Sequence, residues 1–109
     1  TVDPKRDNFF AYKGVTLTAP GFYAPQGRTI RINSIRPDFL EKVASAKLDQ
    51  HEITNIEMET AAYYAFASSL GHEMISINAI LANRITHEFS SDPEMQIQKL
   101  IELVIDSIA

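Results

Sequence analysis

The chain has 109 residues, with 10 Lys and Arg against 14 Asp and Glu, so its formal net charge is −4. Its length suits one compact domain, and 45% apolar residues exclude a disordered or collagen-like protein. The acidic balance argues against nucleic acids or anionic membranes as partners. The sequence contains no Cys, which excludes disulfides, thiolate nucleophiles and Cys-ligated zinc. We expect a cytoplasmic location.

The first half of the chain predicts a strand, a loop and a helix. Aromatic and β-branched residues over 9–18 predict the strand. Residues 19–28 contain two Pro and two Gly, which predicts a loop. Residues 29–35 alternate polar and apolar side chains and predict a short extended piece. Pro37 suits the first position of a helix, whose apolar face would be formed by Phe39, Leu40 and Val43.

The middle of the chain predicts a strand, a helix and a second strand. Residues 51–55 predict a strand, and the pattern Thr54-x-x-Glu57 matches a capping box that opens a helix. This helix should end at Gly71, and because it is apolar on most sides we expect it to be tightly packed. The apolar run over 74–82 predicts a strand buried on both faces.

A helix with a clear apolar stripe ends the chain. Ser91 is expected to cap it, Pro93 to occupy its first position and Glu94 to complete a second capping box. The order strand, helix, strand, helix, strand, helix predicts the α/β class, a layered βαβ fold with a mixed, largely parallel sheet. Ligands bind beyond the carboxyl ends of such strands, where we place residues 19–28, 56–60 and 83–92.

Glu57, Met58 and Glu59 stand together at a predicted strand-to-helix junction. The helix dipole alone favours carboxylates there, by ~0.3–1 kcal/mol each. A buried carboxylate at this edge could also accept hydrogen bonds from a vicinal diol, such as the 2′ and 3′ hydroxyls of ribose. Met58 offers a polarizable apolar surface for the face of a sugar.

Phe22, Gln26 and Arg28 lie in the predicted loop after the first strand. They are either incidental members of a surface loop or a binding set for a heterocycle. A Gln side chain can face an amide edge, an Arg supplies donors for a carbonyl, and an aromatic ring packs against a base. A uracil ring, with two carbonyls around one N–H, would satisfy this set.

Arg84 follows the third predicted strand, where it is either a solvated surface charge or a cation that meets the base. His51, His72 and His87 show no metal-ligand spacing, so we expect no metal site.

The order and spacing of these motifs resemble the carboxyl-terminal part of uridine phosphorylases, members of the nucleoside phosphorylase family. The motifs are Phe22-Tyr-x-x-Gln26-x-Arg28, Asn55-x-Glu57-Met58-Glu59 and Asn83-Arg84. The resemblance covers nearly all of the chain and implies a phosphorylase/hydrolase-like α/β domain. The Glu-Met-Glu element is shared across the family, whereas the Phe, Gln and Arg pattern is more typical of uracil recognition.

The resemblance also implies a role for each motif residue. It implies that Phe22 packs against base and sugar, that Gln26 addresses the pyrimidine amide edge and that Arg28 addresses a carbonyl. Glu57, Met58 and Glu59 match the ribose segment, with Glu59 as the expected ligand of the sugar hydroxyls. Arg84 matches the Arg near the base and is the expected catalytic residue. Purine-acting relatives carry an Asp in this region, where this chain has Asn83-Arg84.

Two departures from the family pattern bear on what the chain contains. Pro25 stands where many uridine phosphorylases have Gly. In the family, the phosphate site lies in the amino-terminal half and consists of a Gly-rich segment, Arg residues and a His from a neighbouring subunit. Residues 1–109 match only the carboxyl-terminal part of the family and do not contain this site. Because the sequence also starts at Thr1 without Met, we expect residues 1–109 to be the carboxyl-terminal part of a single domain, inactive by itself.

The expected activity of the intact protein is phosphorolysis of uridine to uracil and ribose 1-phosphate, a step in pyrimidine salvage. The resemblance implies nucleoside and phosphate as partners and a homo-oligomer built from dimers. We expect no cofactor, because positioning and electrostatics supply the catalysis, and the acidic balance predicts neither nucleic acid nor membrane as a partner. A purine nucleoside phosphorylase or nucleosidase of the same superfamily, or a non-catalytic α/β binding module, are the alternatives.

Overall fold

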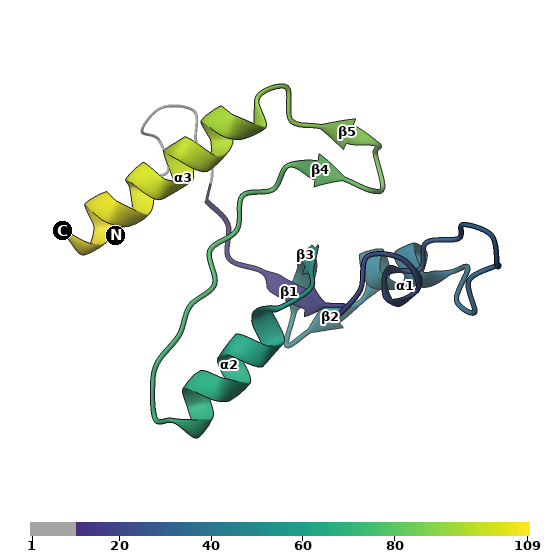
Figure 1. Cartoon of the computed structure of the whole chain (residues 1–109), viewed down its shortest axis with the longest axis horizontal. Helices are drawn as coiled ribbons and strands as arrows, with labels where there is room; N and C mark the ends of the chain where they lie inside the picture. The colour runs from purple at the N-terminus through teal and green to yellow at the C-terminus, as the bar shows by residue number, and fades with distance from the viewer. Residues whose placement is uncertain (1–10) are drawn as a thin grey trace. The chain divides into compact units, whose positions relative to one another are not determined.

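The computed structural model describes residues 11–109, which form two compact units (Figure 1). One unit comprises Gly14–Ser76, and the other contains Ile77–Ala109 together with the described residues before Gly14. Each unit is described by itself. The expected strand over 9–18 is present as β1 (Val15–Thr18), and residues 9 and 10 lie outside the described part of the chain.

The first unit is built on a three-stranded mixed sheet in the order β1-β3-β2. β3 (His51–Glu57) runs parallel to β1, with Thr18 opposite Glu57 at the carboxyl end of both strands. β2 (Lys47–Leu48) pairs antiparallel with β3 through a two-residue turn whose residues, Asp49 and Gln50, have φ values of 48° and 70°. The structure confirms the α/β class with a mixed, partly parallel sheet.

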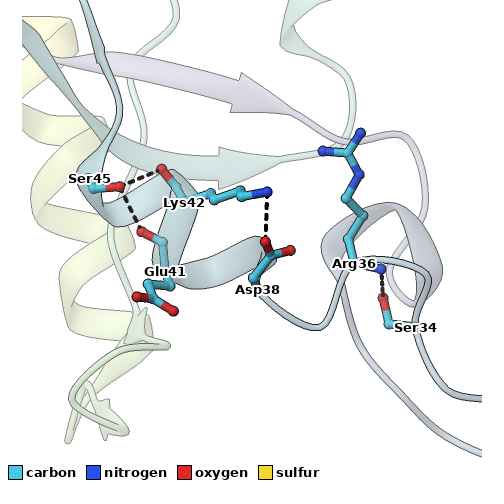
Figure 2. A network of polar contacts seen from close by, with 6 residues as sticks. All are labelled: Ser34, Arg36, Asp38, Glu41, Lys42 and Ser45. Carbon is cyan, nitrogen blue, oxygen red and sulfur yellow. Dashed lines mark hydrogen bonds and ion pairs between the residues drawn. The ribbon is translucent and has the colours of Figure 1, made fainter.

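The predicted helix is present as α1 (Phe39–Ser45), but it begins two residues after Pro37, so Pro37 precedes the cap residue Asp38 and is not the first helical residue. Its first turn is joined by an ion pair between Lys42 and Asp38, with 2.6 Å between Nζ and Oδ2 (Figure 2). The hydrogen bond from Lys42 lowers the pKa of Asp38. At the other end, the Ser45 hydroxyl donates to the carbonyl of Glu41 at 3.0 Å (Figure 2). These exposed contacts hold the short helix together locally.

The helix α2 (Thr60–Ser69) follows β3 and ends where the sequence predicts. Gly71 has φ +74°, and the amides of Gly71 and His72 donate to the carbonyls of Ser68 and Ala67, which is the Schellman pattern of helix termination. The predicted capping box is wrong, because Thr54 lies inside β3, at the irregularity in its pairing with β1. Glu57, at the last position of β3, caps the helix instead.

The apolar side chains of α2 are exposed, so the expectation of tight packing is wrong for the described residues. Tyr63, Phe66 and Leu70 expose 54%, 68% and 70% of their surface. Composition shows which side chains favour burial, but burial needs an apolar surface opposite them. The buried positions in the described chain are Ala19, Gln26 and Thr60. Ala19 directly follows β1, Thr60 is the first residue of α2, and Gln26 lies in the loop between β1 and α1.

Two predicted extended segments form no strand. Residues 72–81 have no regular structure, and Ile75 is 75% exposed. Residues 29–35 are a bent loop in which Ile35 is 98% exposed. A strand is held by ladder hydrogen bonds to a neighbour, and no described strand pairs with residues 29–35 or 74–81. Ala82, the last residue of the predicted run 74–82, pairs with Phe89.

The second unit contains a hairpin and a long helix (Figure 1). β4 (Ala82–Asn83) pairs antiparallel with β5 (Glu88–Phe89). The amphipathic helix α3 (Pro93–Ile108) is confirmed with Pro93 at its first position, but Asp92, not Ser91, caps it by accepting from the Met95 amide at 3.0 Å. Glu94 therefore forms no capping box with Ser91. No helix of the described chain has the length and apolarity to span a membrane.

Candidate functional site

The carboxyl ends of β1 and β3 meet at one edge of the sheet because the two strands are parallel neighbours. The Ala19 amide, the first after β1, donates to the Glu57 carbonyl at 2.8 Å. Two of the three segments that the sequence places at a ligand-binding edge, 19–28 and 56–60, therefore start side by side. The third segment, 83–92, belongs to the other unit.

Phe22, Gln26 and Arg28 come together within the loop after β1. The guanidinium carbon of Arg28 lies 3.8 Å from the centre of the Phe22 ring, a cation–π contact. The Arg28 Nη1 group donates to the Phe22 carbonyl and to the Gln26 side-chain oxygen. Tyr23 adds an edge-to-face contact with Phe22, with 5.2 Å between the ring centres. The structure thus joins the three residues that the sequence proposes for base binding.

The loop reaches this arrangement through a tight turn. Pro25 lies in the short 3-10 helix η2 (Ala24–Gln26), after which Gly27 adopts φ +70°. The amide of Arg28 then donates to the Tyr23 carbonyl at 3.0 Å, which folds Arg28 back toward Phe22. The turn also buries Gln26, which is only 5% exposed, so its side chain has a fixed environment.

The Glu57 carboxylate is bound by three donors of its own chain. One oxygen accepts from the Thr18 hydroxyl, and the other accepts from the amides of Glu59 and Thr60, both at 2.7 Å. Partial burial raises the pKa of this carboxyl, but the hydrogen bonds from Thr18 and from the two amides outweigh burial and lower the pKa to about 2. Glu57 is therefore ionised and caps the first turn of α2.

Glu59 and Met58 are presented differently from Glu57. Glu59 stands at the cap position of α2 through its backbone, since its amide donates to Glu57 and its carbonyl accepts from the Ala62 amide. Its side chain is exposed, and Met58 is 38% exposed. Of the two carboxylates in the Glu57-Met58-Glu59 segment, Glu57 is used within the fold and Glu59 faces outward.

Arg84, the expected catalytic residue, lies in the turn of the β4–β5 hairpin of the other unit. The Asn83 side-chain oxygen accepts from the amides of Ile85 and Thr86 at 2.9 and 3.2 Å, which folds the turn that carries Arg84. The structure gives Arg84 a defined local setting within this hairpin.

Thr18 is a residue of this edge that sequence reasoning missed. Its hydroxyl donates to Glu57 and accepts from the Ala61 amide at 2.9 Å. The alternation of Thr16, Leu17 and Thr18 indicates a strand, but the partner of Thr18 depends on the register with β3, which sequence spacing does not reveal. Within residues 11–109, no cluster of three or more His, Asp or Glu residues could hold a metal ion.

Comparison with known proteins gives the chain its relatives. The Phosphorylase superfamily matches residues 5–107. A uridine phosphorylase of Thermococcus kodakarensis is 35% identical over 83 residues, which are 76% of this chain and 29% of that protein. The chain thus spans less than a third of the length of this relative. No solved structure shows a significant match.

Proposed function

Because the chain belongs to the phosphorylase superfamily, we propose that the complete protein is a uridine phosphorylase in which these residues supply the nucleoside-binding side. The proposed reaction converts uridine and phosphate into uracil and ribose 1-phosphate. The joining of Phe22, Gln26 and Arg28 in one folded loop carries this proposal. The name of the relative from Thermococcus kodakarensis supports the choice of a pyrimidine nucleoside.

The loop has the chemistry to bind a uracil ring. The two hydrogen bonds of the Arg28 side chain both use Nη1, and a guanidinium carries further donors on Nη2 and Nε that suit a carbonyl oxygen. Gln26 contributes an amide, and the Phe22 ring offers an apolar face for stacking. The contact with Phe22 holds the Arg28 side chain in place before a ligand arrives, which lowers the entropy cost of binding.

The proposed reaction breaks the bond between C1′ of ribose and N1 of uracil. The electron pair of that bond leaves with uracil, while a phosphate oxygen forms a new bond to C1′. Donors from Arg28 and Gln26 stabilise the negative charge on the departing uracil, which a proton then neutralises. Glu59 is the proposed acceptor for the ribose hydroxyls and Met58 the contact for the sugar face, while Arg84 is proposed to act near the base.

The proposed reaction uses phosphate as co-substrate and no cofactor, since positioning and electrostatics supply the catalysis. The remaining expectations, a homo-oligomer, a cytoplasmic location and inactivity of residues 1–109 alone, stay predictions.

The test is uracil release by the purified complete protein, followed by chromatography with and without phosphate. We expect release from uridine only when phosphate is present, with ribose 1-phosphate as the second product. Release without phosphate would identify a nucleosidase instead. Cleavage of inosine but not of uridine would favour a purine phosphorylase, and binding of uridine without turnover would favour a binding module.

A further inference from the structure

We infer that Thr18 is a positioning residue for the sugar-binding segment: its hydroxyl fixes Glu57, and Glu57 in turn fixes the backbone of Glu59. This inference rests on the proposed function, because it names what orients the proposed ribose ligand. Thr18 and Glu57 are 39 positions apart in the sequence, and they lie opposite each other where β1 pairs with β3.

The first step of the argument is the double use of the Thr18 hydroxyl. It donates to the Glu57 carboxylate and accepts from the Ala61 amide at 2.9 Å. A hydroxyl has one donor and two acceptor lone pairs, so both bonds form at the same time. Thr18 therefore ties the end of β1 both to the end of β3 and to the first turn of α2.

The second step is the link from Glu57 to Glu59. The Glu57 oxygen that does not contact Thr18 accepts from the Glu59 and Thr60 amides, both at 2.7 Å. These bonds fix the backbone around Glu59, the residue whose exposed side chain is the proposed ligand of the ribose hydroxyls. A hydroxyl on one strand thus determines where a carboxylate outside the sheet is placed.

In the third step, two substitutions distinguish the effect of the Thr18 hydroxyl from that of the Thr18 methyl group. Thr18→Val keeps the shape of the side chain but removes both hydrogen bonds, leaving an amide at the helix start without its acceptor. Thr18→Ser keeps the hydroxyl. Thr16, on the same strand and equally half-buried, accepts a long hydrogen bond of 3.4 Å from Asn55 and makes no recorded contact with the Glu57-Met58-Glu59 segment. Thr16→Val is therefore the matched control.

The experiment measures steady-state kinetics of the complete protein with uridine and phosphate varied separately. For Thr18→Val we expect the KM for uridine to rise on the order of 10-fold, with the KM for phosphate unchanged. Thr18→Ser should restore the KM for uridine, and Thr16→Val should leave it at the wild-type value. Melting temperatures of the variants with Val show whether a loss of stability accompanies the change.

Each outcome has one meaning. A wild-type protein without phosphate-dependent release of uracil overturns the proposed function, and the role of Thr18 falls with it. If the wild type is active, three results overturn the role of Thr18 alone. The first is a wild-type KM for uridine in Thr18→Val. The others are a KM for uridine that rises in Thr18→Ser as much as in Thr18→Val, or that rises equally in Thr16→Val. A rise in both KM values also overturns the inference, since it indicates general damage to the fold.

Discussion

The guanidinium of Arg28 lies over the Phe22 ring, with 3.8 Å between its central carbon and the ring centre, and it donates a hydrogen bond to the Phe22 carbonyl. One side chain therefore contacts both the ring and the backbone of a residue six positions earlier. Arg can do this because its guanidinium is planar and carries donors in a fixed geometry. The contact gives the loop a fixed shape before any ligand binds.

Arg28→Lys in the complete protein should lower kcat/KM for uridine on the order of 100-fold, the typical effect of removing a donor that stabilises charge in the transition state. A Lys keeps the positive charge but has neither the planar fork nor the stacking surface. Steady-state kinetics measure the effect. Arg31→Lys, at an exposed position of the same chain segment, is the control, and equal losses in both variants would contradict a specific role for Arg28.

Gly27→Ala should destabilise the protein by ~2–3 kcal/mol and weaken uridine binding. The residue has φ +70°, and an added Cβ would lie 2.6 Å from the Cβ of Phe39. Gly71→Ala is the matched control, because Gly71 has φ +74° but open space around it. It should cost only ~1 kcal/mol, the price of a left-handed backbone alone. Thermal unfolding compares the two, and equal losses would show that the contact with Phe39 is not the cause.

The elements with local signals could be predicted from the sequence. The helix α3 follows from its apolar spacing and Pro93, and the end of α2 follows from Gly71. The structure of residues 74–82 could not be predicted in this way, since their apolar run shows a preference for burial and says nothing about which backbone pairs with it. Among the described residues, Phe89 pairs with Ala82 at the end of this run, and no strand pairs with 74–81.

The candidate site also has a part that local sequence signals predict and a part that depends on strand pairing. Phe22, Gln26 and Arg28 lie within seven positions of each other, and the loop that joins them is marked by its Pro and Gly residues. The contact between Thr18 and Glu57 spans 39 positions and depends on the pairing of β1 with β3. In the sequence, Glu57 and Glu59 are two carboxylates separated only by Met58. Their different surroundings are seen only in the hydrogen bonds of the folded chain.

The caps of α3 provide a test of structure against sequence pattern. Asp92→Ala should lower stability by ~1 kcal/mol, because the Asp92 carboxylate accepts from the Met95 amide. Ser91→Ala, at the position that the pattern favours, should change stability by less than ~0.5 kcal/mol. Thermal unfolding and hydrogen exchange of the first-turn amides measure both. A larger loss for Ser91→Ala would show that Ser91 is the cap.

The stability contributed by Glu57 should depend on pH. Its pKa is lowered from an ordinary value of 4.5 to about 2 in the folded chain, so the ionised carboxylate favours folding. This contribution is complete above about pH 4.5 and is lost as the pH falls through about 2. At neutral pH, Glu57→Gln should cost ~1 kcal/mol, as the loss of a helix cap does, and the difference from wild type should shrink as the solution is acidified.

Unfolding midpoints of the two proteins between pH 7 and pH 3 check this dependence. Glu52→Gln is the control, since Glu52 lies on the same strand but is exposed and makes only a 4.0 Å ion pair with Lys47. It should stay within ~0.5 kcal/mol of wild type throughout. A difference between Glu57→Gln and wild type that does not change with pH would mean that the ionised carboxylate is not what stabilises the fold.

Glu59→Gln tests the division of work between the two carboxylates of the Glu57-Met58-Glu59 segment. Glu59 is exposed, and its recorded bonds to described residues use the backbone, so the substitution should leave the melting temperature near that of wild type. A charged acceptor binds hydroxyls more strongly than a neutral amide does. We therefore expect the KM for uridine to rise on the order of 10-fold, since a hydrogen bond to a charged group contributes ~1.5–3 kcal/mol against ~0.5–1.5 kcal/mol for the neutral bond that Gln retains. Calorimetry of uridine binding and steady-state kinetics measure the loss, and unchanged binding and turnover would show that Glu59 does not hold the ribose.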